Sequence, residues 1–76
     1  MTERSLHIWT IYERPLDFPD SYVARRFEVS RGVTVATKQI MLARDIAPIR
    51  ATLAAKGLVK IARSPADDPN IVETWI

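Results

Sequence analysis

Carboxylate side chains gather in two proline-containing segments of this 76-residue chain, and they are the first candidates for chemistry. They are Asp17, Asp20, Asp67 and Asp68. Carboxylates are the natural ligands of Mg²⁺ and Ca²⁺, so these residues suggest a hard-metal site. However, the segment 67–70 lacks the alternation and the glycine of a calcium loop, and aspartates beside prolines are typical turn formers. The sequence therefore favours structural turns, and we expect no metal and no cofactor.

Catalytic equipment is sparse in the rest of the chain. His7 is the single histidine, and no cysteine is present. A catalytic histidine needs a nucleophile and an orienting group, and no serine lies in a nucleophile motif. The two glycines, Gly32 and Gly57, form no phosphate-binding loop. The sequence therefore favours a protein that is not an enzyme and predicts no catalytic residue.

Arg25 and Arg26 lie between two aromatic residues, Tyr22 and Phe27. Cations beside aromatic rings are typical of sites that bind single-stranded nucleic acid. Neighbouring residues of a strand point to opposite faces, however, so the two arginines cannot form one patch if this segment is a strand. We therefore expect that one arginine, but not both, pairs with a carboxylate of the acidic segments. Nucleic-acid binding through Arg25 and Arg26 is the alternative.

Composition narrows the class of protein. The net charge is only +2, from 11 basic and 9 acidic residues, with +1 in each half of the chain. Nucleic-acid-binding proteins usually show a clustered basic footprint, which this chain lacks. No apolar run approaches the length of a membrane span, and no secretory signal opens the sequence. We expect a single domain over residues 1–76, located in the cytoplasm.

The elements that must position these residues are predicted as five strands and one helix. The strands are Leu6 to Tyr12, about Tyr22 to Val29, Val33 to Thr37, Leu58 to Ile61, and Ile71 to Ile76. Whether residues 33–37 form a strand is left open, and Lys38 to Arg44 is expected to be an irregular or extended lead into the helix. Ser30-Arg31-Gly32 is a tight-turn signal between the second and third strands.

The helix is predicted over residues 45–56. Asp45 can cap its first turn, and Gly57 is placed to end it in the left-handed conformation. Ile46, Ile49 and Leu53 form one apolar stripe, which we expect to face a sheet. The fold class is therefore α+β, with a mainly antiparallel sheet of four to five short strands and one helix packed on one face.

The second strand is expected to turn Val23, Arg25, Phe27 and Val29 toward the core. If residues 33–37 are a strand, the acidic segments emerge at one end of the sheet and form a common rim near the arginines. Its candidate interaction residues are Asp17, Asp20, Arg25, Arg26, Arg63, Asp67 and Asp68.

Three stretches of the chain follow a pattern of their own. They are Trp9-Thr10-Ile11-Tyr12, the stretch from Asp17-Phe18-Pro19-Asp20 to Val23-Ala24-Arg25-Arg26, and Arg63 to Trp75. With these motifs, which cover about half of the chain, the sequence resembles a group of short, uncharacterised bacterial proteins, some of them prophage-encoded. The resemblance implies one domain and supplies no mechanism.

The sequence thus favours a small binding or adaptor domain that acts through protein–protein contacts, with a partner that it does not identify. The apolar end Trp75-Ile76 and the small size also fit a homodimer. The alternative is a small nucleic-acid-binding protein. The least favoured interpretation is a metal-assisted hydrolase that uses the acidic segments.

Overall fold

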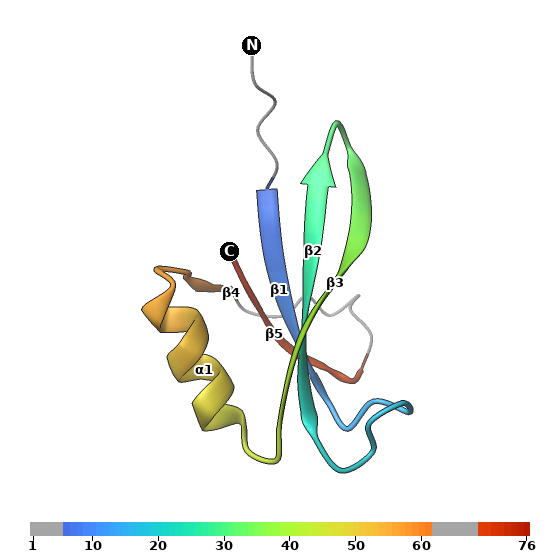
Figure 1. Cartoon of the computed structure of the whole chain (residues 1–76), viewed down its shortest axis with the longest axis vertical. Coiled ribbons are helices and arrows are strands. Elements are labelled where there is room, and N and C mark those ends of the chain that lie inside the picture. The colour runs from blue at the N-terminus through green and yellow to red at the C-terminus, as the bar shows by residue number, and fades with distance from the viewer. Residues whose placement is uncertain (1–5, 62–68) are drawn as a thin grey trace.

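Five strands and one helix follow one another in the order that the sequence predicts. The computed structural model describes residues 6–61 and 69–76. Its elements are β1 (Leu6–Glu13), β2 (Tyr22–Ser30), β3 (Val33–Ala43), α1 (Ile46–Ala55), β4 (Lys60–Ile61) and β5 (Ile71–Trp75). All strand pairs are antiparallel, and they form one sheet in the order β3-β2-β1-β5-β4 (Figure 1). The prediction of an α+β fold with an antiparallel sheet is confirmed.

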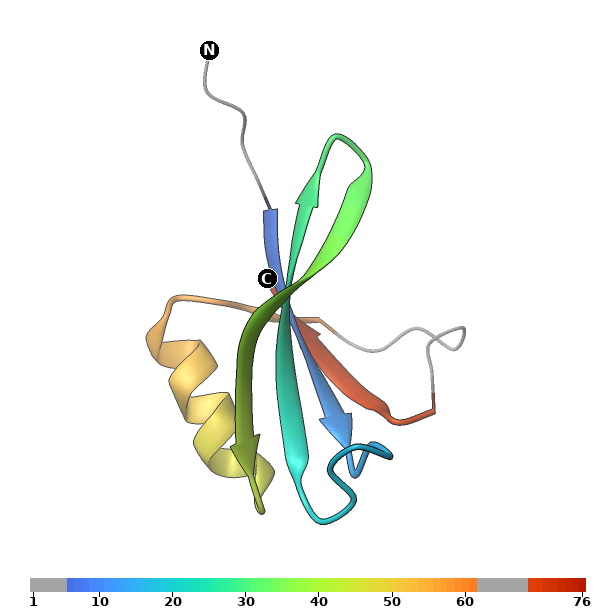
Figure 2. The same cartoon turned by 45° about the vertical axis from the view of Figure 1, so that its right-hand side comes forward.

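The third strand exists and is longer than predicted. Residues 33–43 form one continuous strand, so the lead over residues 38–44, which was expected to be irregular or extended, is extended up to Ala43. The strand bulges in this stretch, because Ile40 lies opposite Arg25 whereas Ala36 lies opposite Phe27, so β3 has two more residues than β2 between these pairs. Ala36 and Ile40 still share one face, so the bulge lengthens the strand without exchanging its faces. Figure 2 shows β3 twisting across β2.

The hairpin between β2 and β3 closes through a two-residue turn. Ser30 pairs with Val33, and the φ angles of Arg31 and Gly32 are +52° and +76°. Positive φ at both central residues is the requirement of a type I′ turn, whose twist matches that of the flanking strands. The tight-turn prediction for residues 30–32 is therefore confirmed.

The helix begins and ends close to the predicted residues. Asp45 occupies the N-cap position with an extended backbone, but its side chain makes no capping hydrogen bond to any described residue, so this detail of the prediction is wrong. At the other end, Gly57 has a φ of +83° and its N–H donates to the carbonyl oxygen of Ala54 at 3.0 Å. Gly57 thus ends the helix as predicted.

The buried cluster joins the helix to the sheet. It contains Trp9, Ile11, Ala24, Ile49, Leu53 and Trp75. Two of these residues come from α1, and Ile46 packs against the same cluster, as the stripe predicts. Ile11 lies opposite Ala24, and Trp9 lies opposite Trp75, so the sheet residues of the cluster share one face. We call the face that carries Trp9, Ile11, Ala24 and Trp75 the core face.

This arrangement corrects the predicted core side of β2. The residue that β2 gives to the cluster is Ala24, whereas Arg25 and Phe27 lie on the opposite face. Val23 also belongs to the opposite face by alternation, yet it is fully buried.

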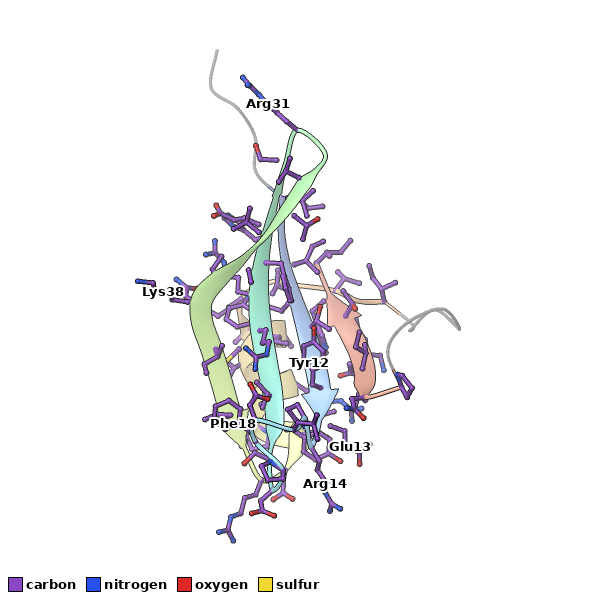
Figure 3. All side chains as sticks on the ribbon, turned by 90° about the vertical axis from the view of Figure 1, so that its right-hand side faces the viewer. Tyr12, Glu13, Arg14, Phe18, Arg31 and Lys38 are labelled. Carbon is purple, nitrogen blue, oxygen red and sulfur yellow. The ribbon has the colours of Figure 1, made fainter. Side chains whose placement is uncertain are left out.

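The opposite face of the sheet is called the open face here. By register it carries Leu6, Ile8, Thr10 and Tyr12 of β1, Val23, Arg25, Phe27 and Val29 of β2, Thr34, Ala36, Ile40 and Leu42 of β3, Ile61 of β4, and Ile71 and Thr74 of β5. Figure 3 looks onto this face, with α1 behind the strands and Phe18, from the segment that joins β1 to β2, at one end. That segment is held by hydrogen bonds from Phe18 N to Pro15 O and from Arg14 N to Ser21 O, at 2.9 and 3.0 Å.

Candidate functional site

Arg25 and Arg26 have different surroundings, as the strand assignment predicts. The Arg25 guanidinium donates to the Asp17 carboxylate, and its Cζ atom lies 6.0 Å from the centre of the Tyr12 ring. Arg26 points to the core-face side, and among the described residues it has no ion-pair partner. The prediction that one arginine pairs with an acidic segment is confirmed, and the two do not form a single basic patch.

The predicted rim is described only in part. Arg25 and Asp17 meet at its first segment, whereas Arg63, Asp67 and Asp68 lie outside the described residues. The backbone N–H of Glu13 donates to the carbonyl oxygen of Asn70 at 2.7 Å. The end of β1 and the entry into β5 are therefore neighbours at one end of the sheet. The proximity of Asp20 to Asp67 in a common rim stays a prediction.

Sequence reasoning missed a buried ionic group on β5. Glu73 is only 5% exposed and accepts two hydrogen bonds from Arg50 of α1, Nε to Oε1 at 2.8 Å and Nη2 to Oε2 at 3.1 Å. The indole N–H of Trp75 donates to the same Oε1 at 3.1 Å. Glu73 comes two residues before Trp75 in the strand, so the two side chains share the core face. This spacing was the only sign in the sequence that Glu73 is buried.

The electrostatics of Glu73 indicate a structural role. Burial raises the pKa of its carboxyl group, but the hydrogen bonds from Arg50 and Trp75 and the positive charges of Arg50 and Lys60 outweigh burial, so the pKa lies below its ordinary value. Glu73 in turn raises the pKa of Arg50. A carboxylate that is kept ionised and occupied by three donors is unsuited to act as a general base.

The open face carries a shallow groove that sequence reasoning also missed. Its volume is about 300 Å³, and it is lined by Ile8, Thr10, Tyr12, Phe27, Thr34, Ile71 and Thr74. These residues come from four strands, and Ile8 and Phe27 lie directly opposite each other in its floor. The lining contains hydroxyl groups and apolar side chains and no charged group. The groove therefore suits a ligand or a partner surface that is apolar or uncharged.

Apolar side chains continue beyond the groove on the same face. Ile40 and Leu42 on β3 are 40% and 48% exposed, and Ile61 on β4 is 41% exposed. Among the described residues of the open face, Arg25 is the one charged side chain, and Asp17 balances it. A sheet face that meets water normally alternates to polar residues. Exposed apolar residues on one sheet face are typical of an interaction site.

A second hollow lies on the core-face side, beyond the end of α1. It has a volume of about 330 Å³ and is lined by His7, Trp9, Arg26, Gln39, Lys56 and Leu58. Nε2 of His7 lies 3.1 Å from Oε1 of Glu28, while Arg26 and Lys56 have no acidic partner among the described residues. This hollow is therefore weakly basic, with an indole ring in its wall.

Neither a metal centre nor a membrane helix is found in the part of the chain that the structure describes. No three or more His, Asp or Glu side chains of residues 6–61 and 69–76 are grouped to hold an ion. Over the same residues, no helix has the length and apolar character needed to cross a bilayer. Comparison with known proteins gives no match to a family model, to a curated protein or to a solved structure.

Proposed function

We propose that this chain is a non-catalytic binding domain that acts through protein–protein contacts on its open face. The observation that carries the proposal is the apolar, almost uncharged surface of that face, with a groove at its centre. In the proposal α1 packs on the core face alone and leaves the other apolar face to a partner. A sheet covered on one side by a helix and on the other by a partner has both of its apolar faces buried.

The dimensions of the surface favour a protein over a small molecule. A volume of about 300 Å³ is at the lower limit of ligand pockets, and such pockets enclose most of their ligand. The groove here is instead a shallow part of a wider apolar face that extends to Ile40 and Leu42 on one side and to Ile61 on the other. Tyr12 and Phe27 supply aromatic side chains of the kind that anchor interfaces.

The Arg25–Asp17 ion pair lies at one end of the open face. It fixes the segment between β1 and β2 to the strand that follows, and Arg25 lies near the Tyr12 ring. Loops held on a rigid sheet are the usual location of recognition residues. Two residues of the rim proposed from the sequence, Asp17 and Arg25, therefore adjoin the apolar face. A cytoplasmic location and membership of the bacterial group that the sequence resembles belong to the same proposal.

Two neighbouring positions of β3 provide a matched test. Thr34 lines the groove, whereas Val35 lies opposite Glu28 on the other face, and both are exposed. Thr34→Arg introduces a charge into the apolar face, and Val35→Arg introduces the same charge next to an acidic residue outside it. Both variants should fold, because exposed substitutions away from special features usually change the free energy of unfolding by less than about 0.5 kcal/mol.

The experiment is affinity purification of the tagged full chain from its native host, followed by binding measurements with the purified partner. We expect Thr34→Arg to weaken binding at least ~10-fold, because an unpaired charge would be buried in the interface. Val35→Arg should bind like the parent. Equal binding by both variants would show that the open face is not the binding surface.

The basic hollow supports a second candidate function, the binding of nucleic acid. Arg26 and Lys56 lack acidic partners among the described residues and share the hollow with Trp9. This candidate uses Arg26 without Arg25, which is engaged by Asp17. Binding of single-stranded RNA or DNA should then weaken steeply with salt and be reduced by Arg26→Gln. Affinity that is independent of salt would exclude it.

A further inference from the structure

We infer that the occupant of the open face is a second copy of this chain, packed face to face. The two sheets would form the inner layers of the dimer, and the two helices would form its outer layers. This inference rests on the proposed function, which it deepens by naming the partner. It is carried by three features of the described residues, namely the charge of the open face, its area and the character of the sheet edges.

The charge distribution allows the open face to meet itself. A two-fold interface places the same surface on both subunits, so any unbalanced charge in it meets a like charge. Arg25 is the one charged side chain among the residues that the register places on the face, and its contact with Asp17 balances it. Lys38 lies between Ala36 and Ile40, but it points away from the sheet (Figure 3). The charged residues of the strands lie largely on the other side, as Glu28, Lys60 and Glu73 do. Self-association therefore encounters little electrostatic opposition.

The area of the face is of the same order as that of a standard interface. Strands about 4.8 Å apart with a rise of about 3.3 Å per residue give β3, β2, β1 and β5 a footprint of roughly 20 Å by 25 Å, on the order of 500 Å² in projection. The accessible surface of protruding side chains exceeds this projection. A standard interface buries about 800 Å² on each partner. Two packed sheets with aligned strands are also a common arrangement, about 10 Å apart.

The sheet edges are less suited to pairing with a second copy. β3 is a long edge strand, but it is bulged, and Lys38 at the bulge points away from the sheet (Figure 3). Bulges and outward lysines are the devices by which proteins prevent edge-to-edge pairing. The other edge, β4, is only two residues long. The face, and not an edge, is therefore the surface that we assign to the dimer.

Sedimentation equilibrium of the purified full chain tests this inference. We expect the parent and Val35→Arg to have twice the mass of the single chain and to dissociate only on dilution. Thr34→Arg should raise the dimer dissociation constant at least ~10-fold. Ile61→Arg, at the far edge of the same face, is a second variant that should act in the same direction. Circular dichroism melts establish that each variant is folded.

The outcomes separate this inference from the proposed function. A parent chain that is monomeric up to high micromolar concentration overturns the dimer. The proposed function still stands in that case if a different protein binds the parent and is lost with Thr34→Arg. A dimer of unchanged affinity in both Thr34→Arg and Ile61→Arg also overturns the inference, because the interface then lies elsewhere.

The chain has no cysteine, so a spin label on Val35→Cys gives an independent check. A defined distance between the two labels is expected at concentrations where the parent is dimeric, and its absence there counts against the dimer.

Discussion

Replacement of Leu53 by alanine is the sharpest test of how α1 is held. Leu53 is completely buried in the cluster that contains Trp9, Ile11 and Trp75. Removal of a buried leucine side chain loses its transfer free energy and leaves a cavity, which together cost about 2–5 kcal/mol. A chain of 76 residues has a free energy of unfolding of roughly 4–11 kcal/mol. Leu53→Ala should therefore remove a large fraction of the total stability.

Urea or thermal unfolding monitored by circular dichroism measures this loss. At about 4–8 °C for each kcal/mol in a domain of this size, we expect the melting temperature to fall by at least ~8 °C. Leu16→Ala makes the same chemical change at a position that is 98% exposed, and it should alter stability by less than about 0.5 kcal/mol. If Leu53→Ala melts like the parent, α1 does not depend on this residue for its attachment to the core face, and the packing described above is wrong.

Three further predictions concern single contacts. The pKa of Glu73 is lowered in the folded chain. The stabilising contribution of Glu73 is therefore present above the unfolded pKa of about 4.3 and is lost as the pH falls below that value. Glu73→Gln should make the urea midpoint less dependent on pH between neutral and acidic conditions. Gly32→Ala should cost about 1 kcal/mol through its positive φ alone, because an added Cβ meets no described atom within 4 Å. Asp17→Asn should cost less than ~1 kcal/mol in chemical unfolding, since the side chains of Asp17 and Arg25 are both partly exposed.

Local signals were sufficient for most of the elements. β-branched and aromatic residues mark β1, and the Arg31-Gly32 pair marks the hairpin turn, because each of these signals acts through the backbone conformation of its own residues. Gly57 ends α1 for the same reason. The length of β3 could not be predicted in this way. Its bulge depends on pairing with β2, which is a contact between distant residues.

The buried ionic group shows a second limit of sequence reasoning. Glu73 is ionised on the core face because Arg50, 23 residues earlier in the chain, reaches it from the helix. No periodic pattern in α1 or in β5 predicts that Arg50 pairs with Glu73. The sequence does show that Glu73 shares a face with Trp75, but an unpaired carboxylate there would be costly, so a strand reading alone favours an exposed Glu73. The contact with Arg50 in the folded chain offsets this cost.

The error in the core side of β2 has a physical meaning for the function. Alternation correctly identified Val23, Phe27 and Val29 as members of an apolar face, and the mistake was to assign that face to the helix. The cluster formed by α1 instead includes Ala24, on the other side of the strand. One ten-residue helix can cover only one face of a sheet, so the second apolar face is the surface for which we propose a partner. In this strand, residues that read as core in the sequence therefore identify the interface that we propose.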